Sequence, residues 1–198
     1  MRATSADSDG RVLRGERNRD ALVDALLGLL EDGVAKPTAR EIAARAEVSL
    51  RTVFAHFDDV ESLYAAIAVR QRQRLEPLFE PLDEAGTDTD RIEALVAQRV
   101  ELYEQIAPVR RASLLLAPES PELTRRLGDV TRALREQLVA QFDVELAAAG
   151  RGRGDLLAAL DVAASWETWD DLRRRQGLSV VAARRTLRLL LTRLLADD

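Results

Sequence analysis

Residues 38–57, TAREIAARAEVSLRTVFAHF, contain two short helical patterns that meet at Ala46-Glu47-Val48. Thr38 and Glu41 have the spacing of a capping box, in which the hydroxyl and the carboxylate each bond a free backbone N–H at a helix start. Ser49 is placed to cap a second short helix directly after the turn. This stretch therefore predicts two brief helices joined by a tight turn.

Helical periodicity continues on both sides of this segment, and the sequence shows neither strand alternation nor an internal repeat. A first helix is predicted to end before Gly33, whose lack of a Cβ suits a helix C-cap. We expect an all-α protein of about nine helices, in which a long fourth helix joins a three-helix N-terminal domain to a C-terminal helical domain. The predicted helices around the central pair cover residues 18–31, 58–79, 91–106, 110–116, 121–149, 155–175 and 180–195. The predicted parts are a mobile arm at 1–15, an N-terminal domain at 16–62 that contains the two short helices, and a C-terminal domain at 63–198.

Composition limits the possible functions. The 198 residues include no cysteine, which excludes disulfides and thiolate metal sites, and no apolar run reaches the ~18 residues of a membrane helix. Residues 1–74 contain 12 basic and 12 acidic side chains, so the whole net charge of −5 lies in the remainder (17 minus 22). A neutral N-terminal half on an acidic body permits local phosphate contacts without general adhesion to nucleic acid. We expect a cytoplasmic protein without cofactor or metal.

The two short helices after a longer one suit DNA recognition. The major groove is about 12 Å wide and admits one α-helix, whose N-terminal residues reach the base edges. Helix N-termini at Thr38 and Ser49 would also present free N–H groups to phosphates. An ordinary corner between two helices with the same caps remains the alternative reading of this pattern.

The motif resembles the N-terminal domain of the tetracycline-repressor (TetR) family over about residues 18–68. The resemblance lies in Thr38 to Ala43, in Val48-Ser49, in Thr52 to Phe57, and in Glu61 and Leu63. It implies a homodimeric repressor that binds a palindromic double-stranded operator and responds to a small molecule. The DNA contacts that it implies are Thr38, Arg40, Ser49, Leu50, Arg51, Thr52, Phe54 and His56.

The chemistry of these residues supports part of this assignment, and three departures from the family pattern weaken it. Arg51, like Arg40, can bind phosphate or guanine, whereas Leu50 offers only apolar contact, and His56 can instead pack locally at a helix end. Phe54 stands where the family usually has Tyr, and Val60 stands where it has Lys, so two phosphate contacts are missing. Glu47 replaces the usual turn glycine, which costs about 1 kcal/mol if the turn needs a positive φ.

The C-terminal half carries the dimer and ligand hypotheses. The last helix is apolar over too wide an arc for one face, which indicates burial against both the core and a second subunit through the last two helices. Tyr103, Phe142 and Trp166 are aromatic side chains from different helices and are candidate pocket-lining residues, although a plain core would use them equally well. Few fixed charges stand at inward positions, which favours an apolar effector.

Two other classes of function remain open. An enzyme would need convergent acids, bases or metal ligands, yet the chain has one histidine, no phosphate-binding glycine loop and no nucleophile elbow. A helical module that binds other proteins would keep the turn motif for structural reasons alone. Loss of DNA binding on substitution of Arg40 and Arg51, with the fold intact, would separate a regulator from that module.

Overall fold

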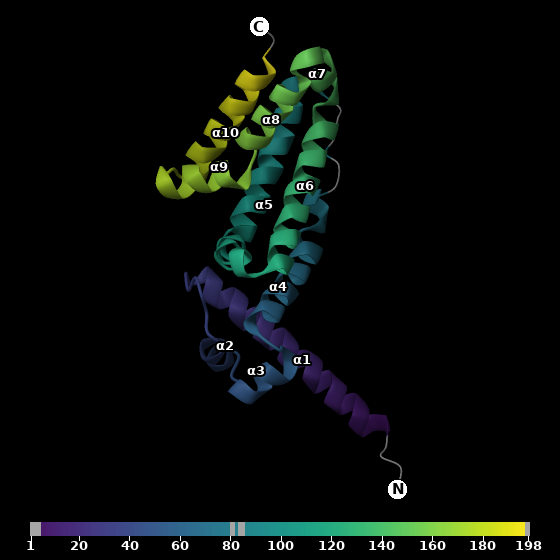
Figure 1. Cartoon of the computed structure of the whole chain (residues 1–198), viewed down its shortest axis with the longest axis vertical. Coiled ribbons are helices and arrows are strands. Elements are labelled where there is room, and N and C mark those ends of the chain that lie inside the picture. Colours follow the sequence, from purple (N-terminus) through teal and green to yellow (C-terminus); the bar gives the residue numbers. More distant parts are fainter. Residues whose placement is uncertain (1–4, 80–81, 83–85, 197–198) are drawn as a thin grey trace. The chain divides into compact units, whose positions relative to one another are not determined.

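The computed structural model describes residues 5–79, 82 and 86–196, with the backbone alone described at 5–14, 60 and 61. Every element in these ranges is helical, which confirms the all-α prediction (Figure 1). The ten α-helices of the described ranges are α1 (Ser5–Glu31), α2 (Ala39–Arg45), α3 (Leu50–His56), α4 (Val60–Arg74), α5 (Asp88–Leu116), α6 (Pro121–Gln141), α7 (Asp143–Ala148), α8 (Arg153–Ala163), α9 (Trp166–Asp170) and α10 (Val180–Leu195). Short 3-10 segments follow α4, α5 and α7, and a π-helical turn follows α9.

The chain divides into two compact units. The first comprises residues 1–74 together with Pro108–Thr124, and the second comprises Leu75–Ala107 with the chain from Arg125 onward. The first boundary follows the last residue of α4, and the other two fall inside helices, at Pro108 in α5 and after Thr124 in α6. The proposed division of the sequence at residue 62 therefore differs from this one, because α4 and a later segment belong to the first unit.

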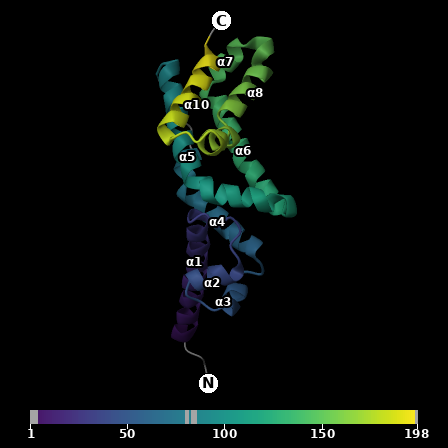
Figure 2. The ribbon, with the colours of Figure 1, turned by 90° about the vertical axis from the view of Figure 1, so that its left-hand side faces the viewer.

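Figure 2 shows α1 to α4 of the first unit lying together. Their apolar side chains form one core. Leu22 and Leu26 of α1, Ile42 of α2 and Leu63 of α4 are fully buried, and Val53 of α3 is 3% exposed. Arg70 of α4 also forms ion pairs with Asp20 and Asp24 of α1. Each short helix is thus held by a few apolar side chains, since helices of seven residues are not stable alone.

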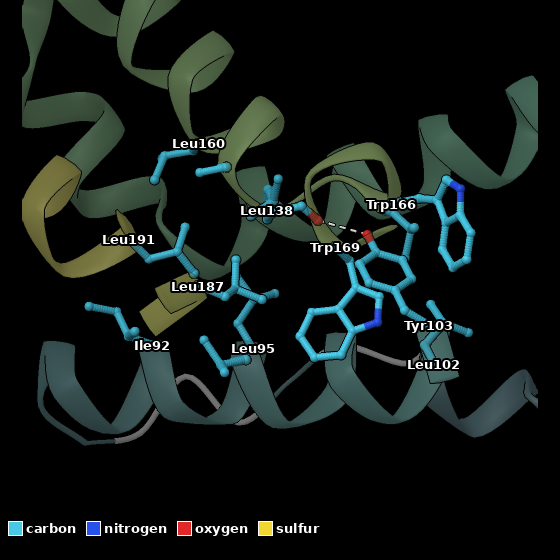
Figure 3. Packing of buried hydrophobic residues seen from close by; sticks show 14 of the residues in the cluster. Ile92, Leu95, Leu102, Tyr103, Leu138, Leu160, Trp166, Trp169, Leu187 and Leu191 are labelled. Atoms are coloured by element: carbon cyan, nitrogen blue, oxygen red, sulfur yellow. Dashed lines mark hydrogen bonds between the residues drawn. The ribbon is translucent and has the colours of Figure 1, made fainter. Parts of the chain in front are cut away.

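The second unit packs α5, α6, α8, α9 and α10 around a larger core, part of which is drawn in Figure 3. Leu95 and Leu102 of α5, Leu160 of α8 and Leu191 of α10 have no exposed surface. Figures 1 and 2 both show α10 beside α8. Glu104 of α5 accepts hydrogen bonds at 3.0 Å from Trp169 Nε1 of α9 and from Arg173 Nε of the π-helical turn.

Contrary to the prediction, Pro108 does not break the fifth helix. α5 continues through Pro108 to Leu116, where the sequence suggested two helices separated at Ala107-Pro108. Proline removes one backbone donor and crowds the preceding turn. Burial on both sides of it holds the helix together, with Tyr103 in the second core and Val109 in the first.

Two long predicted helices are interrupted instead. The segment predicted over 121–149 bends at Phe142 (φ −124°, ψ 34°), and the segment over 155–175 breaks at Ser165. The Ser165 hydroxyl accepts the Thr168 N–H at 3.1 Å and starts a new helix. Apolar periodicity continues through both sites, so the pattern gave no sign of the interruptions.

The N-terminal segment also differs from its prediction. α1 begins at Ser5, so residues 5–15 are helical rather than an irregular arm, and residues 1–4 lie outside the described part of the chain. Extending an existing helix needs no new nucleus, which explains how a Ser-, Asp- and Gly-containing segment can follow the α1 backbone. Among the described residues, none of the helices has the length and apolar character required to cross a membrane.

Candidate nucleic-acid interface

The helix-turn-helix is built as the sequence predicts. Thr38 accepts the Glu41 N–H, and Glu41 Oε2 accepts the Thr38 N–H at 2.7 Å, which completes the capping box of α2. The carboxylate accepts both the N–H and the hydroxyl of Thr38, and these bonds hold the pKa of Glu41 below its ordinary value. The Ser49 hydroxyl accepts the Thr52 N–H at 3.1 Å and caps α3. These caps fix where each short helix begins.

The turn between α2 and α3 is a Schellman motif, and Glu47 occupies its left-handed position with φ 55°. The Val48 N–H donates to the Ala43 carbonyl at 3.0 Å, and the Glu47 N–H donates to the Ala44 carbonyl at 3.3 Å. Glu47 is the one non-glycine residue with positive φ in the described part of the chain. The turn therefore has the positive φ on which the predicted strain depends, and glutamate is strained there.

α3 presents a mixed outer surface. Val53 and Phe57 anchor it to the core, while Arg51, Leu50 (36% exposed) and Phe54 (53% exposed) project from it. An exposed aromatic ring beside an exposed leucine and an arginine offers apolar and cationic contacts on one seven-residue helix. Such a surface matches the base edges, thymine methyl groups and phosphates of the major groove.

The two arginines predicted to bind DNA differ from Arg45 and Arg70, two other arginines of the first unit. Arg40 and Arg51 are exposed, and within the described residues they make no hydrogen bond or ion pair. Arg45, by contrast, pairs with Asp32, and Arg70 pairs with two acids of α1. The charges of Arg40 and Arg51 are therefore available to an external anion.

The other residues predicted to contact DNA already form hydrogen bonds or packing contacts within the protein. Thr38 and Ser49 are exposed, but their hydroxyls serve the caps, and the Ser49 and Thr52 hydroxyls lie 2.8 Å apart in a hydrogen bond. His56 is half-buried at the end of α3, where a Cβ added to Gly15 of α1 would lie 3.7 Å from its Cε1. His56 is thus packed locally and also partly exposed, so its position agrees with either interpretation, local packing at the helix end or contact with DNA.

The three predicted pocket residues are all buried in the core of the second unit. Tyr103 and Trp166 meet edge to face with ring centres 5.8 Å apart, and the Tyr103 hydroxyl donates to the Ala164 carbonyl at 2.7 Å (Figure 3). Phe142 lies in the same core without exposed surface. Two hollows on this unit are lined by other residues, among them Val162, Thr168 and Leu190.

One premise of the ligand prediction is wrong. Few inward charges were expected in the C-terminal helices, but Arg99 of α5 is fully buried and Arg91 is 9% exposed. Both arginines lie among polar residues, a pattern that is typical of a solvent-exposed helix face. The sequence therefore did not predict their burial. An effector without any charge no longer follows from this core.

No protein-family model matches the chain. An HTH-type transcriptional regulator of Mycobacterium tuberculosis is 31% identical over 144 residues, which cover 70% of this chain and 67% of that protein; a Mycobacterium bovis regulator of the same type matches to the same extent. The chain belongs to the HTH-type transcriptional regulators.

Solved structures define the fold of this regulator. A transcriptional regulator from Rhodococcus sp. RHA1 superposes with a TM-score of 0.67 at 21% identity, covering 91% of this chain and 95% of the other. A protein from Mesorhizobium loti described as a TetR-family regulator gives 0.64 at 18% identity, covering 92% and 96%. The fold is that of the TetR family, which confirms the resemblance seen in the sequence. HTH-type transcriptional regulators bind DNA and are a non-enzymatic family, so the enzyme alternative is set aside.

Proposed function

We propose that this regulator is a ligand-responsive homodimeric repressor of the cytoplasm that binds a palindromic operator through α2 and α3. The observation that carries the proposal is the outward presentation of Arg40, Arg51, Leu50 and Phe54 around two capped helix starts. Arg40 at the start of α2 suits phosphate. Arg51 and Leu50 at the start of α3 suit base edges, where an arginine pairs with guanine and an apolar side chain meets a thymine methyl.

A dimer is supported by the apolar surface of α8 and α10. Val162 of α8 is 67% exposed, and Val181, Leu189 and Leu190 of α10 are 69%, 55% and 38% exposed, while the opposite side of α10 is buried. Exposed apolar side chains on neighbouring helices mark an interaction surface. A two-fold pair also explains how a short recognition helix reaches sufficient specificity, since two half-sites are read about 34–36 Å apart or at a multiple of that spacing.

The effector would bind in the core of the second unit, near the Tyr103 and Trp166 pair. Its binding would favour a dimer geometry in which the two α3 helices no longer match successive major grooves. A ligand shifts such an equilibrium only by the difference between its affinities for the two geometries. The ligand-binding and DNA-binding roles would thus belong to different units of one chain.

Selection of random duplex DNA by the purified protein tests this function directly. We expect one enriched, palindromic sequence and a complex of two chains per duplex, measured by light scattering. Enrichment of a non-palindromic sequence would contradict the dimer, and enrichment of none would contradict specific DNA recognition. Arg45→Gln serves as the matched control for Arg40 and Arg51 variants, because Arg45 is a surface arginine already paired with Asp32.

A further inference from the structure

Arg99 is a buried cation whose partners are all neutral. Its side chain lies in the second unit with no exposed surface. Nη1 donates to Gln98 Oε1 and, at 2.6 Å, to Gln137 Oε1, while Nη2 donates to the Leu134 carbonyl at 2.9 Å. None of these acceptors carries a charge.

Arg91, another buried arginine of the same helix, shows how a buried positive charge is compensated. Arg91 forms ion pairs with Glu145 and Asp88. Among the described residues, no carboxylate pairs with Arg99 in this way, and the acid that acts on it through space, Asp161, is ion-paired to Arg135. Burial lowers the pKa of the Arg99 guanidinium, but arginine stays protonated in proteins, so a positive charge remains in the core. An uncompensated buried charge is costly, and the expected remedy is an anion.

The unused donors of Arg99 have the geometry of a carboxylate receptor. A guanidinium has five N–H donors, and three are used here. Nε has no acceptor in the described structure, and Nη2 makes one bond with its two N–H groups. These two donors belong to adjacent nitrogens, the arrangement that binds both oxygens of a carboxylate in parallel.

The surroundings of Arg99 are apolar and aromatic. Tyr103 follows it by one helical turn on α5 and meets Trp166 edge to face. Leu102, Leu134 and Leu138 belong to the same core. We propose that this core binds a small carboxylate with an apolar body, whose oxygens accept from Nε and Nη2 of Arg99 and whose apolar part lies beside Tyr103 and Trp166. The inference rests on the proposed effector function and names the chemical class of that effector.

The test uses the full-length protein and a fixed set of matched compounds. The carboxylates are hexanoate, decanoate, phenylacetate and 2-naphthoate, and the controls are their neutral primary amides. We expect at least one carboxylate to raise the melting temperature and change tryptophan fluorescence, while its amide does neither. Equal effects of acid and amide, or no effect of any carboxylate, overturn the proposal.

Variants of Arg99 assign the effect to this residue. Arg99→Lys keeps the charge but loses the planar pair of donors, so carboxylate affinity should fall by about tenfold or more. Arg99→Gln should abolish the difference between acid and amide, while Arg132→Gln on the surface of α6 should bind like the wild type. Unchanged affinity in Arg99→Lys overturns the assignment. If Arg99→Gln does not fold, the comparison of acids and amides on the wild type still decides.

DNA binding separates this proposal from the one on which it rests. The ligand-free protein is tested against its selected duplex, and the active carboxylate is then added. Operator binding that survives every carboxylate overturns the effector inference while leaving the DNA-binding function standing. Absence of operator binding by the ligand-free protein contradicts the repressor itself, whatever the carboxylates do to its melting temperature.

Discussion

Gly33 and Glu47 occupy the same position in two copies of one helix-ending motif. Each has a positive φ, 88° at Gly33 and 55° at Glu47. In each copy the next residue donates its N–H across the turn, from Val34 to the Leu29 carbonyl at 2.9 Å and from Val48 to the Ala43 carbonyl at 3.0 Å. The same backbone is therefore built once with a residue that suits it and once with a residue that does not.

Replacing Glu47 with glycine should stabilise the protein. The left-handed conformation costs an L-residue roughly 1–2 kcal/mol, part of which is offset by the extra freedom of glycine in the unfolded chain. We expect Glu47→Gly to raise the free energy of unfolding by about 1 kcal/mol, measured by urea denaturation. If Glu47 faces DNA, loss of its charge should also tighten operator binding.

Two controls separate the backbone effect from the charge effect. Glu47→Gln removes the charge but keeps the strained side chain, so it should tighten DNA binding without the gain in stability. Gly33→Ala should destabilise, although a Cβ at Gly33 would meet nothing within 4 Å, because only the backbone conformation opposes it. A stabilised Glu47→Gln would show that charge repulsion, rather than φ, is the cause.

Arg40 and Arg51 should dominate the electrostatic part of DNA binding. Each neutralised phosphate contributes about −0.9 to the slope of log affinity against log salt concentration. We expect Arg40→Gln to reduce that slope by about one and to weaken all duplexes alike, as a phosphate contact does. Arg51→Gln should instead cost about 1–3 kcal/mol on the selected operator and relax the preference at one base pair. An Arg45→Gln protein that lost as much would show that general charge, and not position, explains the binding.

The sequence predicted the features of the fold that depend only on interactions between neighbouring residues. The caps at Thr38 and Ser49 and the helix end at Gly33 were predicted and are present, since each depends on a few neighbouring residues. The exposure of Arg51 followed from its place on a helix whose other side carries Val53. Such features can be predicted because the residues that determine them lie within a few positions of one another.

Features that depend on distant residues were missed. Beside the bend at Phe142, the Gln141 carbonyl accepts a hydrogen bond at 3.3 Å from Nη1 of Arg91, which lies fifty positions before Gln141. The continuity of α5 through Pro108 depends on packing on both sides of it. Arg99 occupies a polar-looking stretch, and its burial follows from helices that come later in the chain. The residues that determine these three features lie too far away along the chain to appear in a local sequence pattern.

The capping box at Thr38 should make α2 sensitive to acid. Thr38→Ala removes a helix cap, which costs about 1 kcal/mol at neutral pH. Because the folded-state pKa of Glu41 is lowered, its contribution is present above the ordinary carboxyl value of 4.5 and is lost as the pH falls through the folded value. The difference between wild type and Thr38→Ala, measured by urea denaturation, should therefore shrink below pH 4.5. Thr192→Ala, on the exposed side of α10, should show no such dependence.

The apolar surface of α8 and α10 should decide the oligomeric state. Val162→Arg or Leu190→Arg would place a charge inside the proposed interface, where desolvating it without a partner is unfavourable. We expect a single-chain mass by light scattering, an unchanged helical circular dichroism spectrum, and a large loss of operator affinity because one chain reads one half-site. Val144→Arg is the matched control, since Val144 on α7 is 65% exposed, close to the 67% of Val162, but lies on neither helix. A dimer that survives Val162→Arg and Leu190→Arg, or dissociates equally with Val144→Arg, would place the interface elsewhere.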